Sequence, residues 1–115
     1  MFDPKVFQPL PTNVNYDGYT IEQGLASVGE GWASLIKLAF EKLPEGIKIV
    51  QVKEKYGGLR IYTDYGGNNA FTALIHDLER RSVTICEVCG KPAKIDTSRY
   101  WLKTLCEEHI TLRKK

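Results

Sequence analysis

The sequence has few cysteines, no long apolar run and little net charge. Three of its 115 residues are cysteines, and no apolar stretch approaches the roughly 20 residues of a membrane-spanning helix. The first residues, Met-Phe-Asp-Pro, lack the basic region and apolar core of a secretion signal. The formal net charge of +2 gives no global indication of a polyanionic partner. These absences argue against a membrane protein or a disulfide-rich secreted protein, and we expect a small cytoplasmic protein.

Four metal-binding side chains occur as two closely spaced pairs in the last third of the sequence. Two residues separate Cys86 from Cys89, two separate Cys106 from His109, and sixteen separate the pairs. Zn²⁺ prefers four such ligands in a tetrahedron, and a complete Cys₃His set leaves no position for water or substrate. Gly90 allows the backbone to curl so that amide groups point at thiolate sulfur. We predict one structural Zn²⁺, in preference to three unrelated cysteines and a surface histidine.

The groups that most catalytic mechanisms need are missing. Every cysteine is a predicted ligand, so no thiol nucleophile remains, and no glycine-rich phosphate loop occurs. Treble-clef nucleases place a histidine base in the finger hairpin, but no histidine lies between Cys89 and Cys106. His76 adjoins Asp77 in sequence, and helix neighbours do not face each other. We therefore predict that the protein is not an enzyme.

The first half of the chain predicts an extended arm followed by two helical segments. Three prolines in residues 1–19 argue against both a helix and a central strand there. Thr20 and Gln23 have the spacing of a capping box. Apolar residues from Trp32 to Leu43 recur at helical spacing, which predicts a helix with one buried stripe. As the first member of this stripe Trp32 is expected to pack in the core, and a binding-site aromatic is the alternative.

Residues 47–65 predict a β-hairpin with a two-residue turn at Gly57-Gly58. This turn would place Glu54 opposite Ile61, on an otherwise apolar face where a carboxylate is a misfit. The predicted apolar face carries Val50, Val52, Tyr56, Leu59, Ile61 and Tyr65. The predicted opposite face carries Lys53, which would oppose Tyr62, together with Lys55 and Arg60.

The remaining chain predicts a second helix and then the metal-binding module. Asn68 or Asn69 can cap a helix whose apolar stripe runs from Phe71 to Leu78. Residues 93–95 and 100–102 predict a small hairpin, and Cys106 and His109 would share one face of a helix from Leu105. This layout is that of a treble-clef finger; a zinc ribbon is the alternative. The predicted fold is α+β, with an arm (1–19), a helix–hairpin–helix core (20–82) and a zinc module (83–115).

One face of the predicted hairpin combines cations with an aromatic ring. Phosphate would attract the cations, and a base could stack on Tyr62. Glycines at the turn would let a ligand approach the backbone closely. The alternative is a solvated sheet edge on which lysines prevent aggregation. The candidate ligand-binding residues are Trp32, Lys53, Lys55, Gly57, Gly58, Arg60 and Tyr62.

Several sequence blocks together resemble small zinc-binding proteins of bacteriophages, prophages and bacteria that have no established activity. The blocks span roughly residues 28–110: Gly29-Glu30-Gly31-Trp32, residues 52–62, residues 86–90 and residues 101–109. The resemblance implies a phage-type accessory protein that acts in the host cytoplasm. Such a protein would bind a host protein, a nucleic acid or a nucleotide signal of host immunity, as in counter-defence.

Two functions follow as expectations. The first is a non-enzymatic protein that binds an anionic partner, nucleic acid or nucleotide, through the basic hairpin face. The alternative is an inhibitor or adaptor that binds a host protein through exposed aromatics such as Tyr62, Tyr100 and Trp101. In both, Zn²⁺ is structural and no membrane is involved. The sequence leaves the oligomeric state open.

Overall fold

Helices and two antiparallel hairpins alternate along the chain. The computed structural model describes residues 15–64, 69–98 and 100–114; the predicted arm therefore lies mostly outside the described residues. No helix in this part of the chain is long and apolar enough to cross a membrane. The elements are α1 (Ile21–Ala26), the 3₁₀ turn η1 (Glu30–Trp32), α2 (Ala33–Glu41), β1 (Ile49–Lys55), β2 (Gly58–Thr63), α3 (Asn69–Ser82), β3 (Lys94–Asp96), β4 (Lys103–Leu105) and α4 (Glu107–Lys114).

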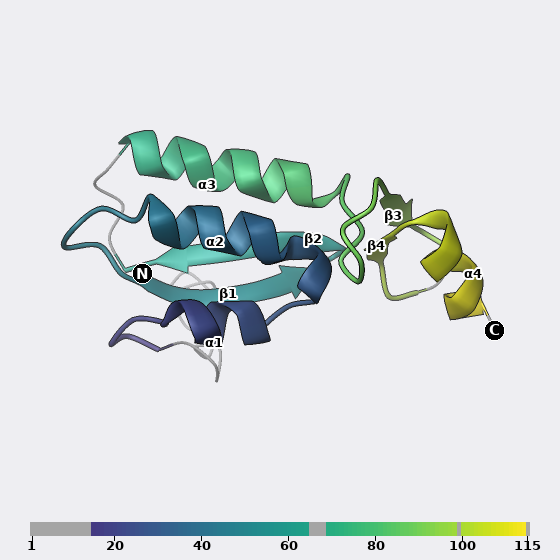
Figure 1. The fold of residues 1–115 in the computed structure, drawn as a ribbon, viewed down its shortest axis with the longest axis horizontal. Helices are drawn as coiled ribbons and strands as arrows, with labels where there is room; N and C mark the ends of the chain where they lie inside the picture. The colour runs from purple at the N-terminus through teal and green to yellow at the C-terminus, as the bar shows by residue number, and fades with distance from the viewer. Residues whose placement is uncertain (1–14, 65–68, 99, 115) are drawn as a thin grey trace, which may run out of the picture.

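The arrangement is a mixed α+β fold with a Cys₃His cluster near its C-terminal end. Figure 1 shows α2 and α3 lying along the β1–β2 hairpin, with β3, β4 and α4 beyond the end where this hairpin turns. The core is formed by the apolar stripes of both helices and one face of the hairpin. Its buried members are Trp32, Leu35, Ile36, Ala39, Ile49, Val52, Leu59, Ile61, Phe71, Ile75 and Leu78.

The predicted capping box at the start of α1 is confirmed. The Thr20 hydroxyl accepts a hydrogen bond from the Gln23 N–H at 3.1 Å, and the Gln23 side chain accepts one from the Thr20 N–H at 2.8 Å. The two bonds satisfy donors that the helix start would otherwise leave unpaired. The helix predicted from Trp32 is also present, although Trp32 itself belongs to the preceding 3₁₀ turn.

The β1–β2 hairpin turns one residue earlier than predicted. The turn residues are Tyr56 and Gly57, whose φ angles are 55° and 83°. Positive φ at both positions is typical of the type I′ turns that join tightly paired strands. Glu54 supports this turn, because its carboxylate accepts a hydrogen bond from the Gly57 N–H at 2.7 Å. The misfit carboxylate thus has a local structural role.

The earlier turn shifts the cross-strand pairing by two residues. Glu54 opposes Leu59, not Ile61 as predicted. Since side chains alternate with a period of two, a shift of two keeps residues 51–55 and their partners on their predicted faces.

The pairing is irregular between Ile49 and Gln51, and there Ile49 joins the core cluster whereas Val50, predicted on the apolar face, does not. The prediction that Tyr56 lies on the apolar face was wrong, because this residue is in the turn and is exposed. Tyr65 lies outside the described residues.

The outer edge of β2 is covered by side chains of α3. The Leu59 N–H donates to the Ser82 hydroxyl at 2.9 Å, and the Ile61 N–H donates to the Glu79 carboxylate at 3.0 Å. Unpaired edge groups invite association with other chains. Here two polar side chains of a packed helix occupy part of that edge and fix the hairpin against α3.

The second hairpin also differs from the prediction. The strand expected at residues 100–102 lies three residues later, at β4, and residues 100–102 belong to the connecting loop. The position of β4 is fixed by Thr104, which is fully buried and whose carbonyl accepts from the Glu87 N–H at 3.0 Å. The following helix begins at Glu107, not at Leu105, with Cys106 immediately before it. The shift leaves two aromatic residues of the loop at the surface.

Candidate metal centre and adjoining cleft

The four predicted ligands converge on one point. The ligand atoms of Cys86, Cys89, Cys106 and His109 all lie within 4.8 Å of one another. The His109 Nδ1 is 3.1 Å from the Cys106 sulfur and 3.5 Å from the Cys86 sulfur, and the Cys89 and Cys106 sulfurs are 3.7 Å apart. A tetrahedral ion with bonds of about 2.1–2.3 Å separates its ligand atoms by roughly 3.3–3.8 Å. The donor set therefore fits one metal ion.

The local backbone conformation brings these four side chains together. Cys86 and Cys89 lie on a tight turn in which the Gly90 N–H donates to the Cys86 carbonyl at 2.9 Å. Gly90 has a φ of 84°, a conformation that glycine adopts without strain. Cys106 directly follows β4, and its carbonyl accepts from the Ile110 N–H at 2.9 Å, so it caps the helix whose first turn carries His109.

Hydrogen bonds favour the thiolate forms of Cys86 and Cys106 but not of Cys89. Burial raises the pKa of the Cys86 thiol, but N–H groups of Cys106 and Cys89 outweigh this effect and lower that pKa to about 6. The His109 N–H lowers the pKa of Cys106, and the Cys106 thiolate in turn raises the pKa of the His109 imidazole. A hydrogen bond from the Lys91 N–H lowers the pKa of the Cys89 thiol, but burial and the neighbouring Cys86 and Cys106 side chains outweigh it and raise that pKa. Thiolates are the ligand form of cysteine, so Cys86 and Cys106 are the two ligands that the polypeptide itself favours in that form.

The metal-binding turn is pressed against the Gly29–Gly31 segment of the core. The Gly31 N–H donates to the Glu87 carbonyl at 3.0 Å. A Cβ on Gly31 would lie 1.8 Å from the Cys86 carbonyl oxygen, and one on Gly29 would lie 2.0 Å from the Glu87 oxygen. Neither distance is possible for a real side chain. These two glycines are therefore contact points between core and metal module.

The tip of the β1–β2 hairpin makes a second junction with the module. The hydroxyl of buried Thr104 donates to the Gly57 carbonyl at 2.5 Å. Glu87, only 7% exposed, accepts from the Lys103 ammonium at 3.0 Å and from the Thr104 N–H at 3.3 Å. Trp32, from the core, adds an indole N–H that donates to the Ile85 carbonyl at 2.9 Å. The first metal ligands are thus tied to the core from both sides.

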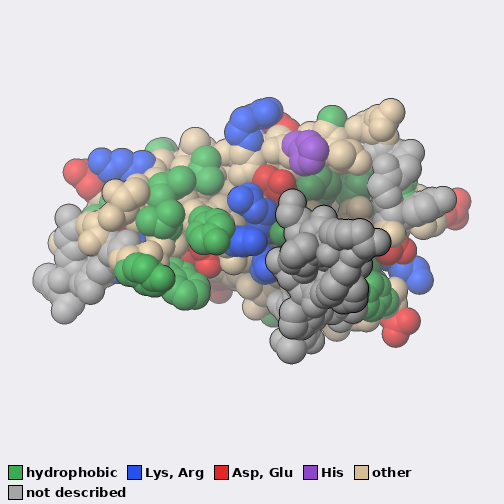
Figure 2. Space-filling model, turned by 180° about the vertical axis from the view of Figure 1, so that it is seen from behind, with side chains coloured by type: hydrophobic (Ala, Val, Ile, Leu, Met, Phe, Trp, Pro, Cys, Tyr) green, Lys and Arg blue, Asp and Glu red, His purple; other side chains and the backbone are tan. Residues whose placement is uncertain are grey.

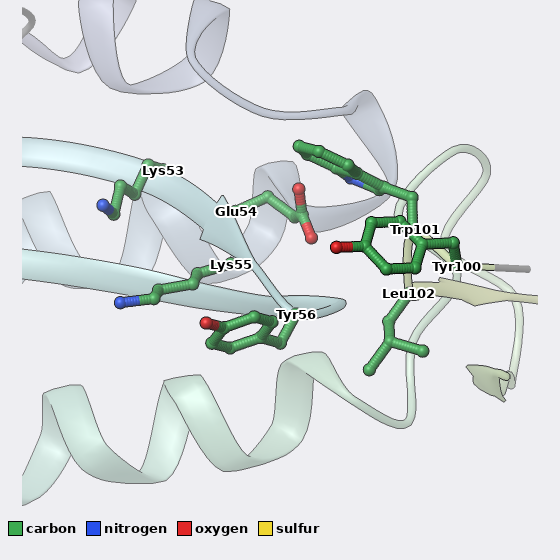
Figure 3. A pocket seen from close by; sticks show the side chains of 7 residues that line it. All are labelled: Lys53, Glu54, Lys55, Tyr56, Tyr100, Trp101 and Leu102. Carbon is green, nitrogen blue, oxygen red and sulfur yellow. The ribbon is translucent and has the colours of Figure 1, made fainter.

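The junction creates a cleft of about 560 Å³ between the hairpin end and the loop before β4. Lys53–Tyr56 line one side and Tyr100–Leu102 the other, as Figure 3 shows. Tyr100 is fully exposed, Trp101 is 64% exposed and Tyr56 is 68% exposed. In Figure 3 the Glu54 carboxylate and the Tyr100 ring point toward each other, and the lysine side chains extend away from the two loop aromatics.

The structure places only some of the predicted ligand-binding residues at the cleft. Lys53 and Lys55 line the cleft, whereas Trp32 is fully buried and packs in the core, so its ring cannot contact a ligand in this structure. Gly57 and Gly58 are also buried; the chain that approaches Gly57 closely is the Lys103 backbone, not a ligand.

The other two predicted residues lie outside the cleft lining. Arg60 and Tyr62 are on the same sheet face as the two lysines. Arg60 opposes Lys53, where Tyr62 was predicted. The Lys53 ammonium lies 5.8 Å from the centre of the Tyr62 ring. Figure 2 shows hydrophobic side chains and lysine or arginine side chains side by side on this face of the molecule.

Sequence reasoning missed several lining residues. Tyr56 was expected in the core and Leu102 in a strand, while Glu54 was seen only as a misfit. Tyr100 and Trp101 were expected to be exposed but were assigned to a different function. The available signal was the run Tyr100-Trp101-Leu102 itself, because contiguous exposed apolar residues mark an interaction site more often than isolated ones do.

No protein-family model matches the chain, and no curated protein or solved structure shows significant similarity to it. The functional conclusions below therefore depend on the residues of the metal centre and the cleft.

Proposed function

We propose that the protein is a non-enzymatic binder of nucleic acid or of a nucleotide, and that its ligand occupies the cleft between the hairpin and the Tyr100–Leu102 loop. The observation that carries the proposal is the combination of Lys53 and Lys55 with three exposed aromatic rings in one cavity. Ammonium groups attract phosphate, and aromatic faces stack with bases of any sequence. A phage-type accessory role follows from the sequence resemblance.

Zn²⁺ is the proposed metal, held in a treble-clef-like module. A turn with two cysteines, a short hairpin and a helix with the last ligand support this assignment. Three cysteine sulfurs and one imidazole nitrogen suit zinc, and four protein ligands leave no position for a reacting water. The role proposed for the ion is structural. Elemental analysis of gently purified protein should find one zinc per chain; a stoichiometric different metal, or none, would contradict this assignment.

A double substitution tests the binding function. Lys53→Ala with Lys55→Ala should weaken binding of the best ligand at least tenfold, because each lysine is expected to contact phosphate. Its free energy of unfolding should stay within about 0.5 kcal/mol of the parent, as for other surface changes. The ligand panel comprises single- and double-stranded oligonucleotides, nucleoside phosphates and cyclic dinucleotides, measured by fluorescence anisotropy and by thermal shift.

The matched control is Lys37→Ala with Lys42→Ala, which removes the same two charges from exposed positions of and beside α2. This variant should bind as the parent does. Equal losses in the two double variants would assign the effect to net charge alone. If no ligand of the panel binds, the proposed function is wrong.

The exposure of Tyr100 and Trp101 also favours a second candidate, an inhibitor or adaptor that binds a host protein. Aromatic residues are enriched at protein interfaces and often dominate their binding energy. The dependence of binding on salt concentration distinguishes the two candidate functions. Binding of nucleic acid should weaken steeply between about 50 and 200 mM salt, whereas a protein interface with an apolar centre should weaken little.

A further inference from the structure

The cleft has its two lysines at one end, with the Tyr56 ring 5.4 Å from the Lys55 ammonium, and the two loop rings at the other end. Figure 3 shows the ammonium groups of Lys53 and Lys55 directed away from Tyr100 and Trp101. The lysines come from β1, and the two rings come from the loop before β4. A ligand that uses both ends has to be extended, with a base at the rings and phosphate nearer the lysines.

The charge of the cleft disfavours a compact polyphosphate. Among its described lining residues, two lysines oppose one glutamate, which leaves one net positive charge. The carboxylate of Glu54 lies between the two ends and is held there by its hydrogen bond to the Gly57 N–H. A nucleoside triphosphate would bring several negative charges close to this carboxylate, and like charges repel. A nucleic acid strand carries one charge per nucleotide and can direct its phosphates to the lysines.

The positive charge continues beyond the cleft along the hairpin. Lys55 and Lys53 are two residues apart on one face of β1, roughly 7 Å along the strand, and Arg60 opposes Lys53 in the sheet. We call Lys55, Lys53 and Arg60 the basic track. A single small nucleotide would contact only the cations of the cleft. Successive phosphates of one nucleic acid strand could contact all three cations of the track.

We propose that the ligand is single-stranded nucleic acid, with a base stacked on Trp101 or Tyr100 and the neighbouring phosphates on the basic track. The inference rests on the proposed function and narrows it. A duplex would present paired bases whose faces are hidden, so the exposed rings could not stack on them. Stacking and backbone contacts do not depend on base identity, so binding should tolerate many sequences.

The test is a length series of fluorescein-labelled oligothymidylates from 1 to 20 nucleotides, measured by anisotropy with the zinc-loaded full chain. Affinity should rise over about the first four to six nucleotides and then change little. With three phosphate contacts, the logarithm of the binding constant should fall against the logarithm of salt concentration with a slope of about −2. Lys55→Ala should reduce that slope to about −1.4, and Lys37→Ala should leave it unchanged.

Trp101 supplies a separate readout. Trp101→Ala should weaken binding of the longest oligonucleotide roughly tenfold or more without changing the salt slope, since a ring contributes stacking but no charge. Trp101→Phe should recover part of the affinity that Trp101→Ala loses, because it keeps an aromatic ring. If the loss came from misfolding, restoring a ring would not recover the affinity. Full affinity in Trp101→Ala would overturn the assignment of the rings.

The remaining outcomes distinguish this inference from the function on which it rests. If thymidine monophosphate or a cyclic dinucleotide binds as tightly as the longest strand, the protein is a nucleotide binder and the single-strand inference is wrong. A duplex that binds more tightly than the single strand would also overturn it. If no nucleotide or nucleic acid binds but a protein partner does, with little dependence on salt, both the inference and the proposed function fail.

Discussion

Gly31→Ala should detach the metal-binding turn from the core at a large cost in stability. The new methyl group would lie 1.8 Å from the Cys86 carbonyl oxygen and 2.7 Å from two other backbone atoms of the turn. Because real Cβ contacts stay above 3.0 Å, the turn has to withdraw by about 1.2 Å, the difference between these two distances. All three neighbours are backbone atoms, so no flexible side chain can move aside instead.

The magnitude follows from two effects. Overpacking of this kind typically costs about 1–3 kcal/mol. The same displacement breaks the hydrogen bond from the Gly31 N–H to the Glu87 carbonyl, which contributes about 1 kcal/mol. We therefore expect the free energy of unfolding to fall by about 2–4 kcal/mol, a large share of the stability of a small domain. Urea unfolding at a fixed free zinc concentration measures it, since bound metal itself adds stability.

A glycine elsewhere in the chain supplies the control. Gly46 has a φ of 87°, and among the described residues no atom lies within 4 Å of the position where its Cβ would be. Gly46→Ala should therefore cost only the backbone strain of a left-handed alanine, about 1–2 kcal/mol. Gly31 is not among the glycines with positive φ, so its substitution carries no such strain. A loss for Gly31→Ala no larger than that for Gly46→Ala would refute the close contact.

Two further predictions concern buried polar groups of the metal module. Thr104→Val should lower the free energy of unfolding by about 1–3 kcal/mol in urea, because the buried Gly57 carbonyl loses its donor, whereas the exposed Thr72→Val should change it by less than about 0.5 kcal/mol. Hydrogen bonds from the Ser98 hydroxyl and N–H, with a smaller effect of the Arg113 guanidinium, hold the pKa of Asp96 below its ordinary value of 3.8, against the effect of burial. A lowered pKa in the folded state means that the carboxylate stabilises the fold above that ordinary value and loses this effect as the pH falls through the folded-state pKa. Asp96→Asn should therefore be less stable than the parent near pH 7, and the difference in melting temperature should shrink in acid; a constant difference across this range would contradict the assignment.

The cluster of four candidate metal ligands could be predicted from the sequence because the spacing within each pair is local. Two residues between ligands permit only a tight turn or one helical turn, and the structure contains one of each. The faces of the first hairpin were also predictable from Gln51 to its end, because alternation survives a shift of two residues. The irregular pairing between Ile49 and Gln51 leaves no such periodic signal. The position of the turn could not be predicted. Gly57-Gly58 is a strong turn signal, whereas the actual turn places an aromatic residue, Tyr56, at positive φ, which is uncommon.

The cleft could not be predicted because it forms between segments far apart in sequence. Lys55 and Trp101 line the same cleft. They do so because Thr104 anchors the module to the tip of the hairpin and because Gly31 and Trp32 bind it to the core. In the sequence, Gly29 and Gly31 stand out only as part of a block that resembles the small zinc-binding proteins. The role of these two glycines is to admit another part of the same backbone, and a contact of this kind leaves no periodic signal.

The contrasting environments of the two tryptophans make the protein its own optical reporter. Trp32 is enclosed in the core, and its indole N–H is bound to two carbonyls, so its emission should be blue and insensitive to quenchers in solution. Trp101 stands at the mouth of the cleft and is mostly open to solvent. Iodide should therefore quench one emission component and spare the other. Unfolding and occupancy of the cleft can then be followed separately in one unlabelled sample.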